Sequence, residues 1–500
     1  MTFSLVFKII NSMVGLVSSI FVARYMGAEA LGTLAACLAF VALFNVFGDF
    51  GFGIAHFKRV SEGCDLGKCI GLYSRIRLVL ALLTAAITWT GYHLIYSLTG
   101  EYPIDFNYYS FFMIILVSTT LNRFFDFIKM TFSARMEVIK GSVVELTSRL
   151  VNVFFKSVVA ISGLAIIYLA WANLASTIIA IFVAIFLFRN YPIKGFDKEM
   201  FKSYLTFALP LTFVNIVSII SLNIDKVFIS YFVSLEEVGY YTVAQSLTQM
   251  IIFSAGIIVN LLIPTYTRIL SQGTQEELNA FALKVEKYLA LIIFPSVFFL
   301  FFNAQDIIYF IYGKDFSASV IIFKILVLHS LLFMIKQPYS TQLTAMERLK
   351  AIVYIGVTSQ VLNIILNFLL IPDQIGEIKL FGLGAAGSAI SLFISILTAL
   401  ILYRAYLLIN TGFKLNLLIF VYFFIAISST MIPAYLINSF EYASVLKLTI
   451  SFVFSTLLYI GTLWVFRLID SNDIIFYRDF VKISSNIKYF KSEFSNDTSK

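Results

Sequence analysis

Charged residues are scarce in this chain, and their scarcity narrows the class of protein. Only 13% of the 500 residues are charged, whereas 60% are hydrophobic and the mean hydropathy is +0.92. A soluble domain is usually about half apolar and about a quarter charged. The composition therefore excludes an ordinary soluble domain and predicts an integral membrane protein.

Cysteine and histidine are also scarce, with three residues of each. Cys37, Cys64 and Cys69 are too few and too irregularly spaced for a disulfide framework. A metal site at Cys64 and Cys69 would need His56 and Asp65 to complete it, so we predict no metal site and no cofactor. The phosphate loop GxxxxGK[ST], the nucleophile elbow and HExxH are all missing. We therefore predict that the protein is not an enzyme.

The net charge of +8 comes from basic residues that are scattered through short connections. Nucleic-acid-binding proteins gather such residues in a patch, so we predict no nucleic-acid partner. Basic connections alternate with acidic ones along the chain, which is the positive-inside pattern of a cytoplasmic membrane protein with both termini in the cytoplasm. The basic connections contain Lys58, Arg59 and Lys68; Arg135 and Lys140; Arg189, Lys194, Lys198 and Lys202; Arg268; Arg348 and Lys350; and Arg404 and Lys414.

Apolar stretches of spanning length recur from one end of the chain to the other, for example at residues 164–188 and 448–466. A helix needs roughly 20 apolar residues to cross the hydrocarbon core. The sequence predicts an all-α membrane protein with about fourteen transmembrane helices. These are centred near residues 14, 42, 85, 118, 153, 176, 217, 250, 293, 332, 361, 395, 425 and 456.

The chain contains an internal repeat. Residues 21–32 (FVARYMGAEALG) align with residues 228–239 (FISYFVSLEEVG), and residues 147–152 (TSRLVN) align with residues 358–363 (TSQVLN). The two matches lie 207 and 211 residues apart, so one short insertion reconciles them. Six spans per repeat is an even number, and the halves therefore insert in the same orientation. This is the parallel-repeat plan, in which substrate binds between two lobes near the bilayer midplane.

The repeat and the spans together predict the organisation of the chain. We expect a first six-helix lobe at residues 1–188, a cytoplasmic linker at residues 189–203 and a second six-helix lobe at residues 204–409, around a central cavity. Two additional helices follow at residues 410–470. In the tail, residues 471–500, apolar residues at spacings of three and four favour an amphipathic helix on the inner leaflet. A partly ordered tail is the alternative interpretation.

The fifth span carries an unusual polar stripe. Glu145, Arg149, Asn152 and Lys156 fall within about 60° of one helix face. An ionic residue at the centre of a span costs roughly 2.5–3.5 kcal/mol, whereas each large apolar residue returns only about 0.3–0.6 kcal/mol. The stripe therefore faces a wet cavity or polar partners, not lipid. A simple Glu145–Arg149 ion pair that joins two helices is the structural alternative.

Other spans add candidate residues to the same cavity. The second repeat carries Gln360, Asn363 and Asn367 at positions equivalent to the stripe. Asp49 and Asp225 are candidates for ion coupling, and the alternative for Asp225 is a packing residue neutralised by Lys226. Further polar residues inside spans are Lys8, Asn11, Asp49, Asn122, Asp126, Lys129, Gln245 and Gln249. Of these, Lys129 has an alternative role, in which its side chain reaches to an interface.

Several motifs resemble the polysaccharide-exporter branch of the multidrug/oligosaccharidyl-lipid/polysaccharide (MOP) exporter superfamily, the group of O-antigen and teichoic-acid flippases. They are ARYMGAEALG (23–32), FGDFGFG (47–53), NIDKVF (223–228), EVGYYTVA (237–244), PTYTR (264–268) and YGKDF (312–316). The resemblance implies two six-helix lobes that work by alternating access. It also implies cavity cations that receive the pyrophosphate of a polyprenyl-linked glycan. Arg24 matches the family's first-span arginine, and Asp49 and Asp225 match its motif acids.

Together these observations predict a flippase that moves a polyprenyl-diphosphate-linked oligosaccharide, such as an O-antigen unit, from the inner to the outer leaflet. Arg149 and Lys156, with Arg24 and Lys8, would offset the pyrophosphate charge. Expected partners are the lipid-linked glycan, membrane lipids and glycan polymerase machinery. A cation-coupled multidrug antiporter is one alternative, although it favours an acidic cavity. A polytopic glycan polymerase or ligase is another, although the outer connections here are short.

Overall fold

The computed structural model describes residues 2–413, 417–438 and 444–468, without the side chains of residues 2–12, 209–219, 253–261, 438 and 444. The predicted tail helix at residues 471–500 lies outside this part. The described chain forms two compact units: residues 2–289 with 304–413, and Ala290–Asn303 with the residues from 417 onward. The predicted division of the chain into two six-helix lobes stays a prediction, because both lobes fall largely in the first unit.

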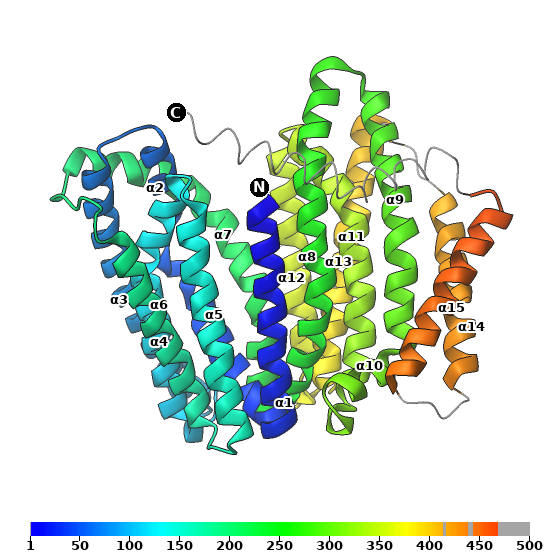
Figure 1. Ribbon diagram of the computed structural model, residues 1–500, viewed down its shortest axis with the longest axis horizontal. Helices are drawn as coiled ribbons and strands as arrows, with labels where there is room; N and C mark the ends of the chain where they lie inside the picture. The colour runs from blue at the N-terminus through cyan, green and yellow to red at the C-terminus, as the bar shows by residue number, and fades with distance from the viewer. Residues whose placement is uncertain (1, 414–416, 439–443, 469–500) are drawn as a thin grey trace. The chain divides into compact units, whose positions relative to one another are not determined.

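The described chain is almost entirely helical, as predicted (Figure 1). Helices prevail because a backbone inside a bilayer must satisfy its own hydrogen bonds. The helices are α1 (Thr2–Phe44), η1 (Asn45–Gly48), α2 (Phe52–Ser61), α3 (Leu66–Thr99), η2 (Phe106–Tyr108), α4 (Tyr109–Ala134), α5 (Val138–Ile161), α6 (Ile167–Phe188), α7 (Lys198–Phe232), α8 (Leu235–Gln272), α9 (Gln275–Phe302), α10 (Ala304–Ile311), η3 (Lys314–Phe316), α11 (Ser319–Ala345), α12 (Leu349–Leu370), α13 (Gly384–Thr411), α14 (Leu418–Asn438) and α15 (Ser444–Val465). The exception is a small antiparallel hairpin of β1 (Gln374–Ile375) and β2 (Ile378–Lys379).

Helix α1 contains two of the spans that the sequence predicts. At about 1.5 Å per residue its 43 residues would measure about twice the thickness of the hydrocarbon core. The helix is broken at Gly27, whose φ of 83° and ψ of −178° suit only glycine. With α1 divided there, fourteen helical segments of the described chain have about the length of a span, and each contains the centre predicted for it.

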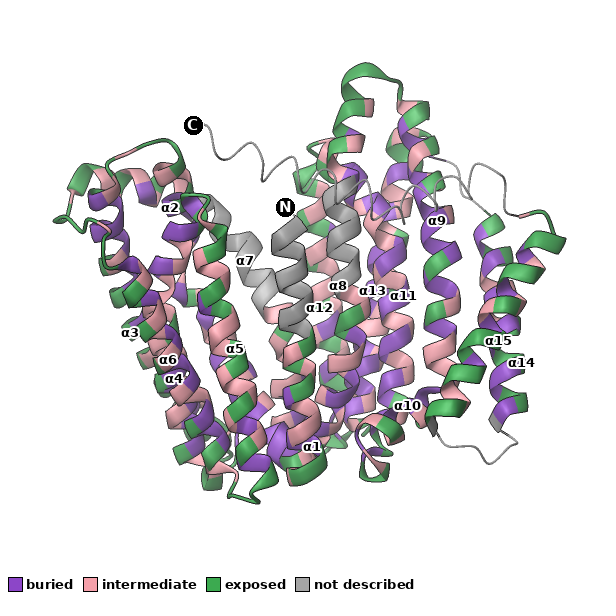
Figure 2. Cartoon of the chain, viewed as in Figure 1, coloured by how far each residue is buried: buried purple, intermediate pink, exposed green. Residues whose placement is uncertain are grey.

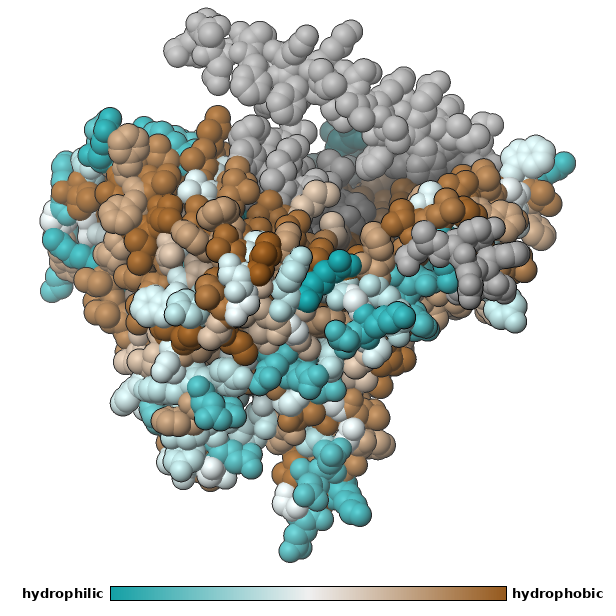
Figure 3. Space-filling model, turned by 60° about the horizontal axis from the view of Figure 1, so that its bottom comes forward, coloured by the Kyte–Doolittle hydropathy of each residue, from teal (hydrophilic) through white to brown (hydrophobic). Residues whose placement is uncertain are grey.

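The surface is that of a membrane protein. Ten helices of the described chain are long and apolar enough to cross a membrane. Many large hydrophobic side chains on these helices are exposed, among them Leu82, Phe182 and Tyr354, and Figure 2 shows exposed residues along the spans. In Figure 3 hydrophobic residues cover much of the visible surface, and hydrophilic residues gather at the end that comes forward. Water-exposed apolar patches of this extent would not persist on a soluble monomer.

The two copies of the first repeat motif pack against each other. A Cβ atom at Gly32 would overlap the carbonyl oxygen of Leu235, and a Cβ atom at Gly239 would overlap that of Ala28. These two contacts exchange equivalent positions, since Ala28 corresponds to Leu235 and Gly32 to Gly239. Small residues let helix backbones approach closely in a membrane. The repeat recognised in the sequence therefore forms a nearly symmetric helix crossing between α1 and α8.

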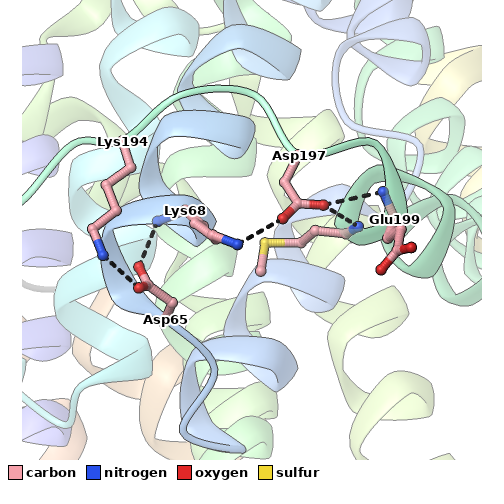
Figure 4. Close-up of polar contacts among 6 residues, drawn as sticks. Asp65, Lys68, Lys194, Asp197 and Glu199 are labelled. Atoms are coloured by element: carbon pink, nitrogen blue, oxygen red, sulfur yellow. Dashed lines mark hydrogen bonds and ion pairs between the residues drawn. The ribbon is translucent and has the colours of Figure 1, made fainter.

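The predicted cytoplasmic linker is held against the first turns of α3 (Figure 4). The backbone NH of Lys194 donates to the carbonyl of Gly67 at 2.9 Å, and a Cβ atom at Gly71 would overlap the carbonyl of Lys194. Two ion pairs flank this contact. Lys194 pairs with Asp65 at 2.5 Å, and Lys68 pairs with Asp197 at 3.0 Å. The pKa of Asp65 is lowered, chiefly by the hydrogen bond from Lys194. We call this arrangement the linker clasp.

The start of α7 packs into the core of the helices before the linker. Tyr204 and Ala208 are fully buried in the same cluster as Phe52, Tyr73 and Phe132. Thus the chain leaves the linker clasp and remains anchored to α2, α3 and α4 for about three turns of α7. The boundary predicted at residue 204 therefore falls inside a helix.

The second unit is built from the end of α9 with α14 and α15. Phe423 of α14 makes edge contacts with Phe294 and Phe298 of α9, and Phe452 of α15 contacts Phe299. Between α9 and α15 lies a mostly apolar groove of about 420 Å³.

Candidate functional site

A polar cavity opens among α4, α5 and α6, with α1 at one side. It consists of two adjoining pockets of about 250 and 360 Å³, which share the lining residues Asn122, Ser148, Arg149 and Thr177. The larger pocket also reaches Gly15 and Leu38 of α1. Most of the other lining side chains are hydroxyl, amide or charged groups, so the cavity suits a hydrated, polar ligand.

All four residues of the predicted stripe on α5 line this cavity. Glu145 and Arg149 line the smaller pocket, and Arg149, Asn152 and Lys156 line the larger one. Arg149 lies 3.5 Å from Glu145 and is 45% exposed, so its guanidinium keeps access to the cavity. The i,i+4 pair that was the structural alternative is therefore present, but such an exposed pair contributes little stability. A Cβ atom at Gly15 would lie 3.6 Å from Nη1 of Arg149, which shows how closely α1 approaches.

Lys156 is the most unusual member of the stripe. Its side chain is only 7% exposed and lines the larger pocket. Among the residues that the structure describes, no carboxylate forms an ion pair with it. A buried ammonium without an acid is costly in a membrane. Such a group marks the place where a negative charge from outside the protein would be stabilised.

A hydrogen-bond network fixes the wall of the larger pocket. The amide of Asn152 donates to the Asn173 side chain at 3.0 Å and to the Ser176 hydroxyl at 2.9 Å. Ser118 and Thr177 share a hydrogen bond at 2.9 Å. These partners on α4 and α6 escaped the sequence analysis, because single hydroxyl residues are common in transmembrane helices and give no periodic signal.

The fourth span contributes a chain of ion pairs that sequence reasoning did not assemble. Lys129 lines the smaller pocket and pairs with Asp126 at 2.9 Å. Asp126 pairs with Arg77 of α3 at 2.6 Å, and Arg77 pairs with Asp49 at 3.2 Å. Asp49, a predicted ion-coupling residue, is therefore engaged with Arg77. Lys129 faces the cavity, so the structure does not support its alternative interfacial role.

The candidates in the second repeat form a separate network. Asp225 is 2% exposed and accepts hydrogen bonds from Asn367 at 2.7 Å and from Tyr241 at 3.1 Å. Asn363 accepts weaker bonds of 3.4 Å from Gln360 and from Asn367. Asn363 and Asn367 are buried and line neither pocket of the cavity. The structure thus places the predicted amide stripe around the predicted carboxylate instead of along the polar cavity.

The remaining predicted residues lie elsewhere. Arg24 donates from Nε to the carbonyl of Ile311 at 2.7 Å, and a second nitrogen donates to the carbonyl of Phe310, so it caps the end of α10. Gln245 and Gln249 lie on α8, half-buried and exposed respectively, and neither lines the two pockets. The side chain of Lys8 lies outside the described residues.

No group of three or more His, Cys, Asp or Glu residues in the described chain could hold a metal ion. His56 hydrogen-bonds through one ring nitrogen to Tyr204 at 3.1 Å and through the other to Thr131 at 2.9 Å. Both of its nitrogens are therefore engaged by hydroxyl groups, and neither is directed at Cys64 or Cys69.

A multi-pass helical bundle with an internal repeat and a cation-lined polar cavity defines a membrane transporter. The fold is similar to that of the lipid II flippase MurJ in an inward closed conformation, with a TM-score of 0.71 and 18% identity over 96% of this chain and 100% of that chain. It is also similar to an inward-facing multidrug resistance MATE family transporter of the MOP superfamily, with a TM-score of 0.63 and 15% identity over 79% of this chain and 94% of the other. A MOP superfamily transporter from Pyrococcus furiosus gives a TM-score of 0.52 and 14% identity over 82% of this chain and 94% of the other.

These similarities show the fold of the MOP superfamily. Residues 21–321 match the family model described as a polysaccharide biosynthesis protein, and the chain belongs to that family. No curated protein sequence matches it. The family match confirms the predicted resemblance at the level of polysaccharide biosynthesis, and the similar structures confirm the predicted fold. The solved structures that share this fold are transporters and a flippase.

Proposed function

We propose that this protein is a flippase for a polyprenyl-diphosphate-linked oligosaccharide, such as an O-antigen repeat unit, and that the diphosphate binds in the cavity beside α5. The observation that carries the proposal is that Arg149 and Lys156 both line one polar cavity. Lys156 has no acidic partner there among the described residues. A diphosphate carries the charge that this ammonium needs. The cavity therefore fits an anionic headgroup better than a cationic drug.

The physical task of a flippase explains the remaining features. A diphosphate cannot cross hydrocarbon without compensation, because isolated charges are expensive there. Arg149 and Lys156 supply that compensation, and Asn122 and Ser148 offer hydrogen bonds to a hydrated sugar. The isoprenoid chain stays in lipid. No covalent bond is made or broken.

Alternating access supplies the movement from the inner to the outer leaflet. The positive-inside pattern supports a cytoplasmic membrane location with both termini in the cytoplasm. Asp225 is a buried carboxylate that accepts hydrogen bonds from the neutral Asn367 and Tyr241 and interacts electrostatically with the neighbouring Lys226. Its burial among neutral hydrogen-bond donors is what favours coupling to a cation at that point, while Lys226 supports the packing alternative. The same carboxylate is the one observation that favours the second candidate, a cation-coupled multidrug antiporter. A glycan polymerase remains the expected partner downstream.

The test is flipping in proteoliposomes, scored by the fraction of a labelled lipid-linked oligosaccharide that becomes accessible from outside. Arg149→Ala and Lys156→Ala should each lower the initial rate by about tenfold or more, as expected for the loss of a charge-assisted contact. Lys350→Ala, at an exposed lysine outside the cavity, is the matched control and should behave as wild type.

Full activity of both cavity variants would overturn the assignment of the site. Wild-type efflux of cationic drugs, without flipping of any lipid-linked glycan tried, would instead establish the antiporter.

A further inference from the structure

The ion pairs beside the cavity form one continuous chain. Lys129 Nζ lies 2.9 Å from Asp126 Oδ1, and Asp126 Oδ2 lies 2.6 Å from Arg77 Nη2. Arg77 Nη1 in turn lies 3.2 Å from Asp49 Oδ1 and donates to the carbonyl of Gly48 at 2.9 Å. Asp49 thus pairs with Arg77, and Asp126 pairs with both Arg77 and Lys129.

The two ends of this series of ion pairs, Lys129 and Arg77 with Asp49, differ in their surroundings. Lys129 is 32% exposed and lines the smaller pocket beside Arg149, so its ammonium can meet a ligand. Arg77 is almost fully buried, and its guanidinium lies 5.3 Å from the Tyr73 ring. A ligand in the cavity can therefore reach Lys129, whereas any resulting change at Arg77 takes place inside the protein.

The other end of this series of ion pairs lies at a break between two helices. Asp49 also accepts a hydrogen bond from the backbone NH of Gly53 at 3.1 Å, at the start of α2. Between them Phe50 has a φ of 46° and Gly51 a φ of 79°. A bulky residue such as Phe50 rarely adopts a positive φ, and its persistence requires that neighbouring contacts hold it. Arg77 supplies two of those contacts, through Gly48 and Asp49.

We propose that Lys129 is a third anion-binding residue of the cavity, which Asp126 occupies until the diphosphate of the substrate displaces it. The released carboxylate of Asp126 then turns wholly to Arg77 and weakens the hold of Arg77 on the break at residues 48–53. Cavity occupancy is in this way transmitted to the junction of α1 and α2. The inference rests on the proposed function, since it requires an anionic ligand in the cavity.

Charge balance supports this exchange. The two cations Arg77 and Lys129 and the two acids Asp49 and Asp126 form a neutral set, so the chain is complete without ligand. Arg123 lies near enough to Asp126 to interact electrostatically with it. After Lys129 turns to a phosphate, Arg77 and Arg123 still compensate Asp126. Asp126 thus keeps two cations nearby, and Asp49 keeps the hydrogen bond from Gly53, which limits the cost of the exchange in a buried setting.

The experiment measures binding and conformation separately, with farnesyl diphosphate as the probe and the full-length protein in nanodiscs. Removing the cation in Lys129→Gln should weaken binding by about tenfold, and removing the competitor in Asp126→Asn should tighten it by about threefold or more. Lys129→Arg should restore most of the affinity. These opposite signs are not expected from a merely structural ion pair, whose loss on either side would act in the same direction.

Conformation is read at the break itself. Phe47 lies in η1 and is 37% exposed, so Phe47→Cys in a background without Cys37, Cys64 and Cys69 can be labelled with a maleimide. Farnesyl diphosphate should change the rate of maleimide labelling in this cysteine variant, and the change should vanish when Lys129→Gln is added.

The outcomes separate the two proposals. If Arg149→Ala abolishes binding while Lys129→Gln leaves both affinity and labelling unchanged, the exchange is refuted and the proposed function stands. If neither variant alters binding, the cavity assignment itself fails. Should Asp126→Asn not fold, Lys129→Gln with its rescue by Lys129→Arg decides the question alone, and a failure of that rescue would overturn the exchange.

Discussion

Lys156 gives the sharpest prediction, because stability and function should change in opposite directions. Its ammonium is 7% exposed and no carboxylate in the described chain forms an ion pair with it. A lysine at the centre of a transmembrane helix costs roughly 2.5–3.5 kcal/mol on insertion scales. The polar lining of the cavity relieves part of that cost, so Lys156→Met, which keeps the length of the side chain, should stabilise the protein by about 1–3 kcal/mol.

The assay is thermal unfolding of the purified protein in detergent, followed by flipping in proteoliposomes. Lys156→Met should raise the apparent melting temperature by a few degrees and reduce flipping by about tenfold or more. The exposed Lys350→Met is the control and should alter neither quantity. A lower melting temperature for Lys156→Met would refute the reasoning, since it would mean that the ammonium has a structural partner. Unchanged flipping would equally contradict the assigned role.

Two further predictions concern the scaffold. Gly239→Ala should lower the melting temperature by several degrees, because its Cβ atom would overlap a backbone oxygen of α1. The control is Gly356→Ala, inside a helix with nothing within 4 Å of the added Cβ atom, which should raise the melting temperature slightly. A similar response of the two variants would argue against the close crossing of α1 and α8. The linker clasp should loosen in acid. Hydrogen bonds from the Met200 backbone and from Lys68 lower the pKa of Asp197, so its contribution is present above the unfolded pKa of about 3.9 and is lost as the pH falls through the lower folded value. Hydrogen exchange of residues 190–197, corrected for the pH dependence of intrinsic rates, should show protection at pH 6 that declines below about pH 4 in wild type. Uniform exchange at both pH values would contradict the ionic contribution.

The spans and the polar stripe were predictable because each rests on a local pattern. Apolar runs of bilayer length located the helices, and the cost of ionic residues in a membrane showed that Arg149 and Lys156 needed a polar environment. Both arguments use only residues within one helix. In the structure all four stripe residues line one cavity, and their role there stays a prediction.

The ion chain beside the cavity was not predictable by the same means. Arg77 lies in a different helix from Asp126 and from Asp49, and no spacing in the sequence joins them. Lys129 and Asp126 were recognised as polar residues of the fourth span, but only the packing of α3 against α4 shows that they share a partner. Periodicity gives the face of a helix, and tertiary packing decides what that face meets.

The second repeat shows the limit of an argument from equivalence. Gln360, Asn363 and Asn367 occupy the positions of Arg149, Asn152 and Lys156, so a shared cavity role was a natural expectation. In the structure Asn367 instead donates to Asp225. The alignment of TSRLVN with TSQVLN shows that the cation of the first repeat is replaced by the neutral Gln360, but it does not show that Asp225 of another helix lies against Asn367.

That difference in charge bears on how the two halves would work together. The first half presents Lys156, a buried cation without an acidic partner in the described chain, and the second presents Asp225, a buried carboxylate whose hydrogen bonds come from Asn367 and Tyr241. Lys156 is costly in a membrane unless an anion joins it, whereas the neighbouring Lys226 already relieves part of the cost of Asp225. In this arrangement the first half would bind an anion and the second half a cation. Each ligand stabilises the buried charge of its own half in whichever conformation admits it, so the two binding events can be linked. In the proposed flippase, the lipid-linked diphosphate and a coupling cation would thus bias one alternating-access equilibrium from two separate sites.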